Sequence, residues 1–217
     1  MSANLPIHVV VTCVLYHDFL ALTLPRTLEL FDQVTVVTIP GDFQTQEVCR
    51  AHGVKPLLTD RFTGNDAQFN KGAAIQEALE SVNSEWVLLL DADILLPAEW
   101  DPAFSKLNPS VIYGCERRLV VGSSQLEALQ HGRRDFPLMR PHEADGRPLP
   151  IGFFQLFHRD KVISHPSYPT AAESDAEFAK SWPVEHREML PITVWHLDSV
   201  ESPHSANWWG RTTPLFT

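Results

Sequence analysis

The sequence contains few cysteines, and their arrangement excludes two classes of small stabilised domain. Cys13, Cys49 and Cys115 lie far apart and form no CxxC pair. The sequence therefore signals neither a disulfide framework nor a zinc knuckle. We interpret all three as buried thiols of a protein in a reducing compartment.

Long apolar runs and an excess of positive charge are also missing. The apolar stretch near the N-terminus has no basic region before it and is shorter than the ~18 residues of a membrane-spanning helix. We therefore expect a cytoplasmic protein without a targeting or anchoring segment. The 17 Lys and Arg residues are outnumbered by 27 Asp and Glu residues, giving a net charge of −10 with His neutral. This acidity argues against generic binding to a nucleic-acid backbone.

The remaining composition is that of an ordinary globular domain. The chain has 217 residues, of which 44% are hydrophobic and 20% charged. This length suits one large domain, and we find no repeat or linker that would divide it. We expect a single domain over residues 1–217.

Apolar runs predict the strands of a central sheet. Residues 7–16 are rich in β-branched side chains and apolar on both faces, as in a strand that is covered on both sides. Further strands are predicted at 33–39, 54–59, 86–90, 111–115, 152–159 and 192–197. Residues 130–150 show no periodicity and predict a long loop, which contains Arg133, Arg134, Arg140 and Arg147.

Helices are predicted between the early strands. Pro25 suits a first helical turn, so a helix is expected from there to about Phe31. Asp42 can cap a second helix, which Gly53 ends. A third follows Gly72, where apolar residues recur at helical spacing. The alternation predicts an α/β fold, with a Rossmann-like, mostly parallel central sheet flanked by helices.

Asp91 and Asp93 directly follow the predicted strand 86–90. In extended backbone their side chains would point to the same face, at the sheet edge where α/β proteins bind ligands. Their oxygens suit Mg²⁺ or Mn²⁺ shared with the phosphates of a nucleotide. The alternative interpretation is an acidic turn that only ends a strand.

Several segments, in order, resemble glycosyltransferases of the GT-A fold. The resemblance is to the family 2-like enzymes and the related galactosyl- and N-acetylgalactosaminyl-transferases, in a small stand-alone bacterial or phage form. It implies a nucleotide-binding part at about 1–98 and an acceptor-side part at about 99–217. The similar segments are 69–72 (FNKG), 75–79 (IQEAL), 86–94 (WVLLLDADI), 152–157 (GFFQLF), 174–178 (SDAEF) with Trp182, 196–197 (HL) and 207–211 (NWWGR).

The resemblance implies a metal site. Asp93 would be the main ligand, Asp91 would lie nearer the ribose or a metal-bound water, and His196 would be the third ligand. Imidazole suits Mn²⁺ better than Mg²⁺, which favours manganese. His196 is followed by Leu197 and Asp198 and not by a second histidine, and a core histidine is the alternative.

Four further residues are predicted to bind the nucleotide sugar. Lys71 and Asn70 stand at the start of a predicted helix, where an ammonium group and free backbone N–H groups can hold a diphosphate. A solvated surface lysine is the alternative. Tyr16 and Asp60 lie at the ends of the first and third predicted strands and are expected near the base and ribose.

A base is needed for an inverting transfer. The resemblance places it at Asp175, with Glu173 as the second choice. Ser174 and Glu177 also fit a capping box, which would put Asp175 at the first helical position, where any acid is favoured. If neither carboxylate is required, a retaining enzyme is the alternative. The residues expected to contact the sugar or acceptor are Gln155, Trp208, Trp209 and Arg211.

The leading hypothesis is a metal-dependent, inverting transfer of a hexose from a nucleotide sugar, with UDP as the expected carrier, to a hydroxyl acceptor. One alternative is a glycosyltransferase for hydroxymethylated bases of phage DNA, using the arginine-bearing loop. A nucleotidyltransferase normally needs a Gly-rich phosphate loop, and residues 12–18 have no glycine. The last alternative is a non-catalytic nucleotide-sugar or glycan-binding protein. We expect no membrane association and no obligate protein partner.

Overall fold

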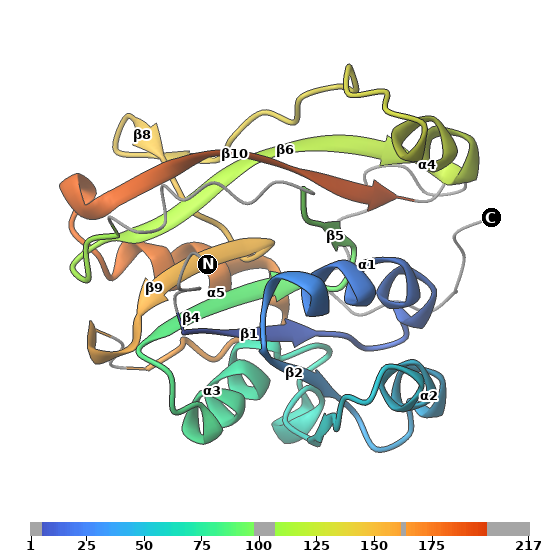
Figure 1. The fold of residues 1–217 in the computed structure, drawn as a ribbon. Coiled ribbons are helices and arrows are strands. Elements are labelled where there is room, and N and C mark those ends of the chain that lie inside the picture. The colour runs from blue at the N-terminus through green and yellow to red at the C-terminus, as the bar shows by residue number, and fades with distance from the viewer. Residues whose placement is uncertain (1–5, 98–106, 162–163, 199–217) are drawn as a thin grey trace.

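The protein is built around one eight-stranded sheet with helices on both faces (Figure 1). The structure is a computed structural model, and it describes residues 6–97, 107–161 and 164–198. The strand order is β3-β2-β1-β4-β9-β6-β10-β5. No helix within these ranges combines the length and apolar character needed to cross a membrane.

The first half of the sheet is parallel, as predicted. β1 (Ile7–Thr12) lies between β2 (Gln33–Thr38) and β4 (Trp86–Asp91), and β3 (Leu57–Leu58) pairs with β2. The helices α1 (His17–Leu30), α2 (Phe43–Ala51) and α3 (Lys71–Ser81) connect these strands, with the short 3-10 helix η1 (Gly64–Asp66) before α3. The carboxyl ends of β1, β2 and β4 therefore meet at one edge.

The second half of the sheet contains both parallel and antiparallel strand pairs. β9 (Phe154–His158) is antiparallel to both β4 and β6 (Ile112–Val121). β10 (Arg187–Asp198) runs parallel to β6, and β5 (Ile94–Leu95) pairs antiparallel with β10 at the edge. The remaining elements are α4 (Gly122–Gln130), the hairpin β7 (Glu143–Ala144) and β8 (Arg147–Pro148), α5 (Ala171–Lys180), η3 (Arg159–Lys161) and η4 (Val184–His186).

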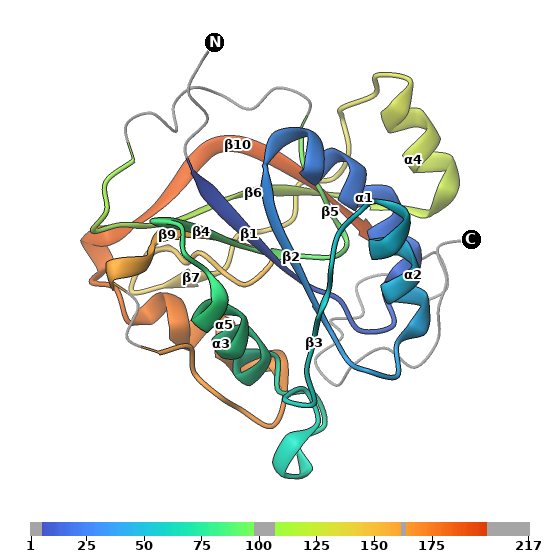
Figure 2. The ribbon, with the colours of Figure 1, turned by 60° about the horizontal axis from the view of Figure 1, so that its bottom comes forward.

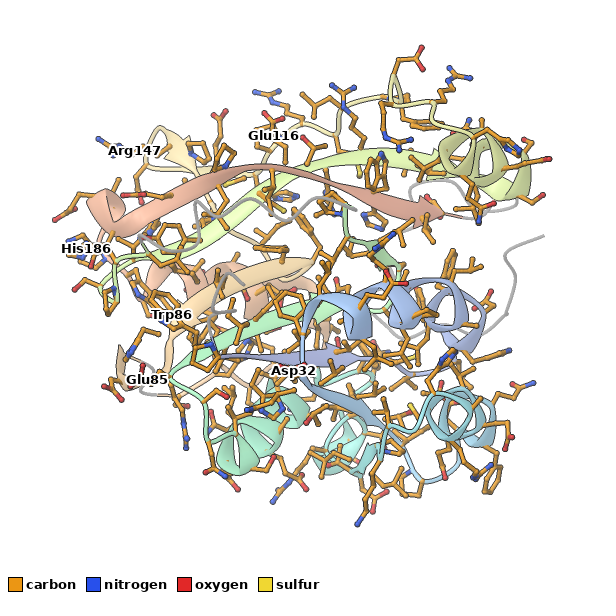
Figure 3. All side chains as sticks on the ribbon, viewed as in Figure 1. Asp32, Glu85, Trp86, Glu116, Arg147 and His186 are labelled. Carbon is orange, nitrogen blue, oxygen red and sulfur yellow. The ribbon has the colours of Figure 1, made fainter. Side chains whose placement is uncertain are left out.

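Apolar side chains on both faces of β1 and β4 form two core clusters. Val9 and Leu88 pack with α1 and α2 on one face, whereas Val10 and Leu89 pack with α3 and α5 on the other. Figure 2 shows α1 beside α2 and α3 beside α5. The prediction that these strands are covered on both sides is confirmed, and all three cysteines are buried and free. Side chains also fill the space between β10 and β4, whereas Glu116 points away from it (Figure 3).

Several predicted boundaries are wrong. α1 begins at His17, so Pro25 lies inside the helix and not in its first turn. The buried face of α1 starts at Phe19 and continues to Thr27, and this burial offsets the backbone hydrogen bond that proline removes. β1 ends at Thr12, four residues early, and the chain then bends at Val14 and Leu15, where Leu15 has a positive φ of 59°.

The strand predicted at 54–59 shortens to Leu57–Leu58, and the one predicted at 111–115 extends to Val121. β10 begins at Arg187 and not at residue 192, and α4 was not predicted. The predicted loop at 130–150 is mostly irregular but contains the small β7–β8 hairpin.

Candidate functional site

The acidic motif lies in a tight turn between β4 and β5. Asp91 ends β4, and Ala92 and Asp93 form a turn, so the predicted extended backbone through both aspartates is wrong. The backbone N–H of Leu197 donates to the carbonyl of Asp93 (2.9 Å), and the Thr23 hydroxyl donates to that of Ala92 (2.7 Å). The turn is therefore fixed by β10 on one side and by α1 on the other.

Lys71 joins two carboxylates at the carboxyl end of β4. Its Nζ lies 2.6 Å from Asp91 Oδ1 and 3.2 Å from Asp175 Oδ2. The lysine is buried, with 6% of the residue exposed, so the alternative of a solvated surface lysine is wrong. It is the first residue of α3, and the side chain of Asn70 caps this helix by accepting from the N–H of Ala73.

Asp175 lies on α5 and faces the same lysine. α5 begins at Ala171, after Thr170 as N-cap, so Asp175 is the fifth helical residue. The predicted capping box at Ser174 is wrong, because Ser174 lies inside the helix and is buried. Asp175 Oδ2 binds Lys71, while Oδ1 is buried and has no hydrogen-bond partner among the described residues. A lone pair of this carboxylate is left for a ligand.

Residues 150–152 form the wall behind Asp175. A Cβ on Gly152 would lie only 1.8 Å from Asp175 Oδ2, so this close approach requires glycine. Gln155 donates from Nε2 to the carbonyls of Pro150 (3.0 Å) and Asp175 (2.9 Å). It is fully buried and braces the wall against α5, and its predicted contact with a sugar or acceptor stays a prediction.

Asp93 faces His196 across the β5–β10 pairing. His196 Nε2 lies 3.3 Å from Asp93 Oδ2, and His196 Nδ1 lies 3.0 Å from an Arg117 guanidinium nitrogen. Asp93 Oδ1 is buried and has no hydrogen-bond partner within the described ranges. Such an oxygen is costly unless a ligand or water satisfies it.

A hard divalent cation would meet this need. No three His, Cys, Asp or Glu side chains of the described residues are grouped so that they could hold a metal ion. An Mg²⁺ or Mn²⁺ that takes one or two carboxylates and completes its shell with substrate phosphates does not need such a group. The orphaned oxygen of Asp93 therefore fits a metal held jointly by protein and substrate.

The two aspartates of the turn differ in pKa. Burial raises the pKa of Asp91 to about 6, with Asp93 and Asp175 adding to the rise and Lys71 opposing it. Burial also acts to raise the pKa of Asp93, but neighbouring His196 and the charge of Lys71 more than offset it and hold that pKa below its ordinary value. The carboxylates raise the pKa of Lys71 despite its burial. The site thus holds a charged lysine between acidic groups.

The other predicted site residues lie in different surroundings. Tyr16 is half-buried at the start of α1, its ring 5.6 Å from that of Phe19, and Asp60 is exposed after β3. Glu173 is exposed on α5, and no contact described in the structure joins it to Lys71. Trp208, Trp209 and Arg211 lie outside the described residues.

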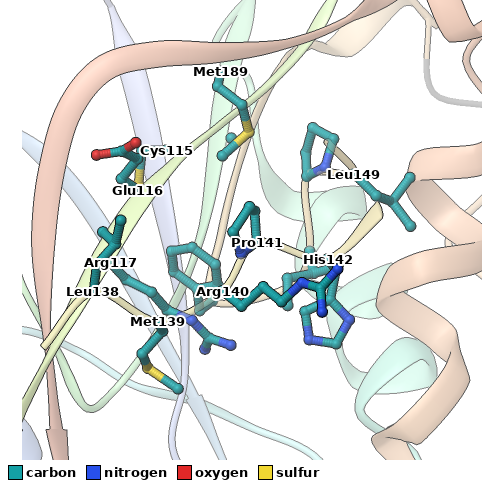
Figure 4. A pocket seen from close by; sticks show the side chains of 14 residues that line it. Cys115, Glu116, Arg117, Leu138, Met139, Arg140, Pro141, His142, Leu149 and Met189 are labelled. Atoms are coloured by element: carbon teal, nitrogen blue, oxygen red, sulfur yellow. The ribbon is translucent and has the colours of Figure 1, made fainter. Parts of the chain in front are cut away.

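Arg117 is a site residue that the sequence did not indicate. Its guanidinium lies 4.4 Å from the centre of the Phe153 ring as well as against His196. Arg117 and Phe153 also line a pocket of about 400 Å³, which includes its open mouth, between β6 and residues 138–151 (Figure 4). The rest of its wall is mainly apolar and includes Leu138, Leu149 and Met189.

Comparison with known proteins identifies the fold. No family model and no curated protein matches the chain. The structure is similar to a mannosyltransferase from Pyrobaculum calidifontis solved with GDP-Man and Mn²⁺ (15% identity, TM-score 0.59, 96% of this chain and 60% of that one). It is also similar to S. aureus TarS with UDP-GlcNAc (13% identity, TM-score 0.61, 89% and 58%). The chain has the GT-A fold.

A third neighbour is the glucosyl-3-phosphoglycerate synthase of M. tuberculosis, with 14% identity and a TM-score of 0.52 over 98% of this chain and 75% of that one. The chain spans about 60% of the length of the first two structures. The predicted GT-A architecture is confirmed. The narrower relationship to galactosyl- and N-acetylgalactosaminyl-transferases stays a prediction.

Proposed function

We propose that the protein transfers a hexose from a nucleotide sugar to a hydroxyl acceptor with inversion at the anomeric carbon. The observation that carries the proposal is Asp175. Its Oδ2 is held by Lys71 at the carboxyl end of β4, while its buried Oδ1 has no partner among the described residues. A carboxylate that is fixed at one oxygen and has no hydrogen-bond partner at the other suits a general base at a ligand-binding edge of the sheet.

In the proposed reaction Asp175 Oδ1 accepts the proton of the acceptor hydroxyl. The acceptor oxygen forms a bond to the anomeric carbon as the bond from that carbon to the diphosphate oxygen breaks. The electron pair of the broken bond leaves with the nucleoside diphosphate. Lys71, held between Asp91 and Asp175, keeps the base in place.

The donor is proposed to lie along the carboxyl ends of β1 to β4. In this arrangement residues 1–98 bind the nucleotide, with Tyr16 near the base, Asp60 near the ribose and Lys71 and Asn70 at the start of α3 near the diphosphate. We propose UDP as the carrier. Neighbouring structures contain either GDP-Man or UDP-GlcNAc, so both carriers belong in the test.

Asp93 is proposed to hold Mn²⁺ or Mg²⁺ through its orphaned Oδ1, with Asp91 near the ribose or a metal-bound water. When bound, such an ion neutralises charge on the leaving diphosphate. Asp93 presents its oxygen at the turn, and His196 contacts its other oxygen. The partners expected are therefore a nucleotide sugar, a divalent cation and a hydroxyl acceptor.

The test is a calorimetric screen of UDP- and GDP-sugars with Mn²⁺, followed by hydrolysis and acceptor trials that include hydroxymethylated DNA. We expect a nucleotide sugar to bind only with metal present, and Asp93→Ala to abolish both binding and turnover. Asp198→Ala, a nearby acid on β10, is the matched control and should keep both. Full turnover in EDTA would contradict the metal requirement, and tight binding without any turnover would favour a binding protein.

A further inference from the structure

His196 lies between Arg117, which can only donate a hydrogen bond to a ring nitrogen, and Asp93, whose carboxylate can only accept one. β10 separates β6 from β5, and the register pairs His196 with Leu119 on one side and Ile94 on the other. Arg117 is two residues before Leu119 and so lies on the same face of the sheet. The imidazole therefore has Arg117 at Nδ1 (3.0 Å) and Asp93 at Nε2 (3.3 Å).

Only one form of the ring satisfies both contacts. A guanidinium group has hydrogen-bond donors and no acceptor, so its contact with Nδ1 requires a lone pair on that nitrogen. In a neutral imidazole the proton is then on Nε2, where it faces the acceptor Asp93 Oδ2. The chain of donation runs from Arg117 to His196 to Asp93.

A metal ion bound at Nε2 would require the opposite form. The lone pair would have to be on Nε2 and the proton on Nδ1, which would then face the guanidinium N–H groups of Arg117. Arg117 is not free to withdraw without loss, since it is half-buried and its guanidinium stacks on the Phe153 ring at 4.4 Å. The surroundings of His196 thus disfavour direct ligation.

We propose that His196 is a positioning residue, fixed by Arg117 as the Nε2–H form, which donates to Asp93 Oδ2 and leaves Asp93 Oδ1 as the cation ligand. The role of Oδ1 rests on the proposed function, whereas the form of the ring does not. Partners of this kind orient a ligating carboxylate, and losing one typically weakens metal binding about 10–100-fold.

The form of the ring is measured by nitrogen NMR on the full chain with ¹⁵N-labelled histidine, without metal, at neutral pH. The His196 signals are assigned from their loss in His196→Gln. We expect a protonated Nε2 and an unprotonated Nδ1. A protonated Nδ1, alone or together with Nε2, would overturn the proposal.

The role of Arg117 is tested with Arg117→Met and Arg117→Lys in the same experiment. Each variant should gain a population protonated at Nδ1, the Lys variant less than the Met variant. Arg118→Met is the matched control, because Arg118 lies next on β6 and donates to Phe136 O on the other face, and it should leave the ring unchanged. An unchanged ring in both Arg117 variants would refute the role of Arg117.

Ligation is tested with Mn²⁺ alone and pulsed electron paramagnetic resonance, which detects a directly bound imidazole nitrogen. We expect bound Mn²⁺ without a nitrogen signal that depends on His196, and 10–100-fold weaker Mn²⁺ binding in His196→Leu. A His196 nitrogen on the ion would overturn the proposal while leaving the transferase activity intact. Failure of Mn²⁺ to bind both alone and in the presence of UDP or GDP would remove the cation role of Asp93 Oδ1. Lack of transfer with the expected ring form would refute only the proposed function.

Discussion

The Nζ of Lys71 lies 2.6 Å from Oδ1 of Asp91, so the first residue of α3 is tied to the last residue of β4. Asp175 Oδ2, at 3.2 Å, extends this ion pair to α5. The consecutive elements α3 and β4 and the distant helix α5 thus meet on one ammonium group.

Replacing Lys71 with Met should destabilise the fold. The change leaves Asp91 and Asp175 close together without their cation, and removing one partner of a largely buried pair costs about 3 kcal/mol. Urea unfolding measures this loss. Lys180→Met breaks the exposed pair with Glu177 and should change the midpoint little, so equal losses in the two variants would contradict a special role for Lys71.

Asp175→Asn should reduce kcat by about 10²–10⁴-fold with little change in donor affinity, because the amide keeps the shape but cannot accept the proton. Glu173→Gln, on the same helix and exposed, is the control and should keep kcat near the wild-type value. If Glu173→Gln lowers kcat and Asp175→Asn does not, Glu173 is the base. If both variants stay active, a retaining mechanism becomes the better interpretation.

Gly152→Ala should impair turnover without unfolding the protein. The added methyl group would collide with the Asp175 carboxyl, whose Oδ2 lies 1.8 Å from the position of the new Cβ. The side chain can rotate away, so the base is misplaced and kcat should fall at least about 10²-fold. Gly41→Ala is the control, since a Cβ there meets nothing within 4 Å. A Gly152→Ala enzyme with normal kcat would show that the position of Asp175 is not critical.

His165 should make stability depend on pH. Burial lowers its pKa from 6.5 to about 4, and its ring stacks on Phe178 at 4.4 Å between centres. Between pH 6.5 and 4 the unfolded chain therefore binds more protons at this residue, so stability should fall as the pH falls, by up to about 3 kcal/mol.

The raised pKa of Asp91 makes the folded protein more stable as the pH falls from 6 to 3.8, which opposes the effect of His165. This contribution of Asp91 should be the same in wild type and in a His165→Phe variant. The measurement is therefore the difference in unfolding free energy between wild type and His165→Phe across this range. Wild type should lose stability relative to the variant on acidification. Parallel curves would show that His165 is protonated equally in folded and unfolded chains.

Much of the fold could be predicted because its signals are local. The apolar runs of β1, β2 and β4 gave their positions, and Asp42 and Asn70 cap the helices that follow them. The position of Pro25 led to a wrong predicted start of α1. Burial of the long apolar face of α1 is a tertiary effect, and it outweighs the local preference of proline for the first helical turn. α5 begins before Ser174 for a similar reason, since Ala171 and Phe178 both pack inward.

The site was predictable only in part. The aspartates of the turn, Lys71 and Asp175 carried sequence signals, but burial of Lys71 depends on contacts between α3, β4 and α5. Residues 116–118 are charged, so the apolar pattern did not predict that β6 continues through them. In β6, Arg117 and Arg118 point to opposite faces of the sheet and contact different partners. Arg117 becomes recognisable only when β6, β10 and β5 are placed side by side.

The strand order also sets the shape of the sheet through chain length. β9, β6 and β10 separate β4 from β5, so these two strands would be about 19 Å apart in a flat sheet. Only Ala92 and Asp93 connect them along the chain, and three residue steps span at most about 11 Å. The sheet must therefore curve until its far edge returns to the end of β4. The short covalent connection between β4 and β5 therefore enforces this curvature. An insertion after Ala92 would allow the sheet to flatten and would increase the distance between Asp91 and His196.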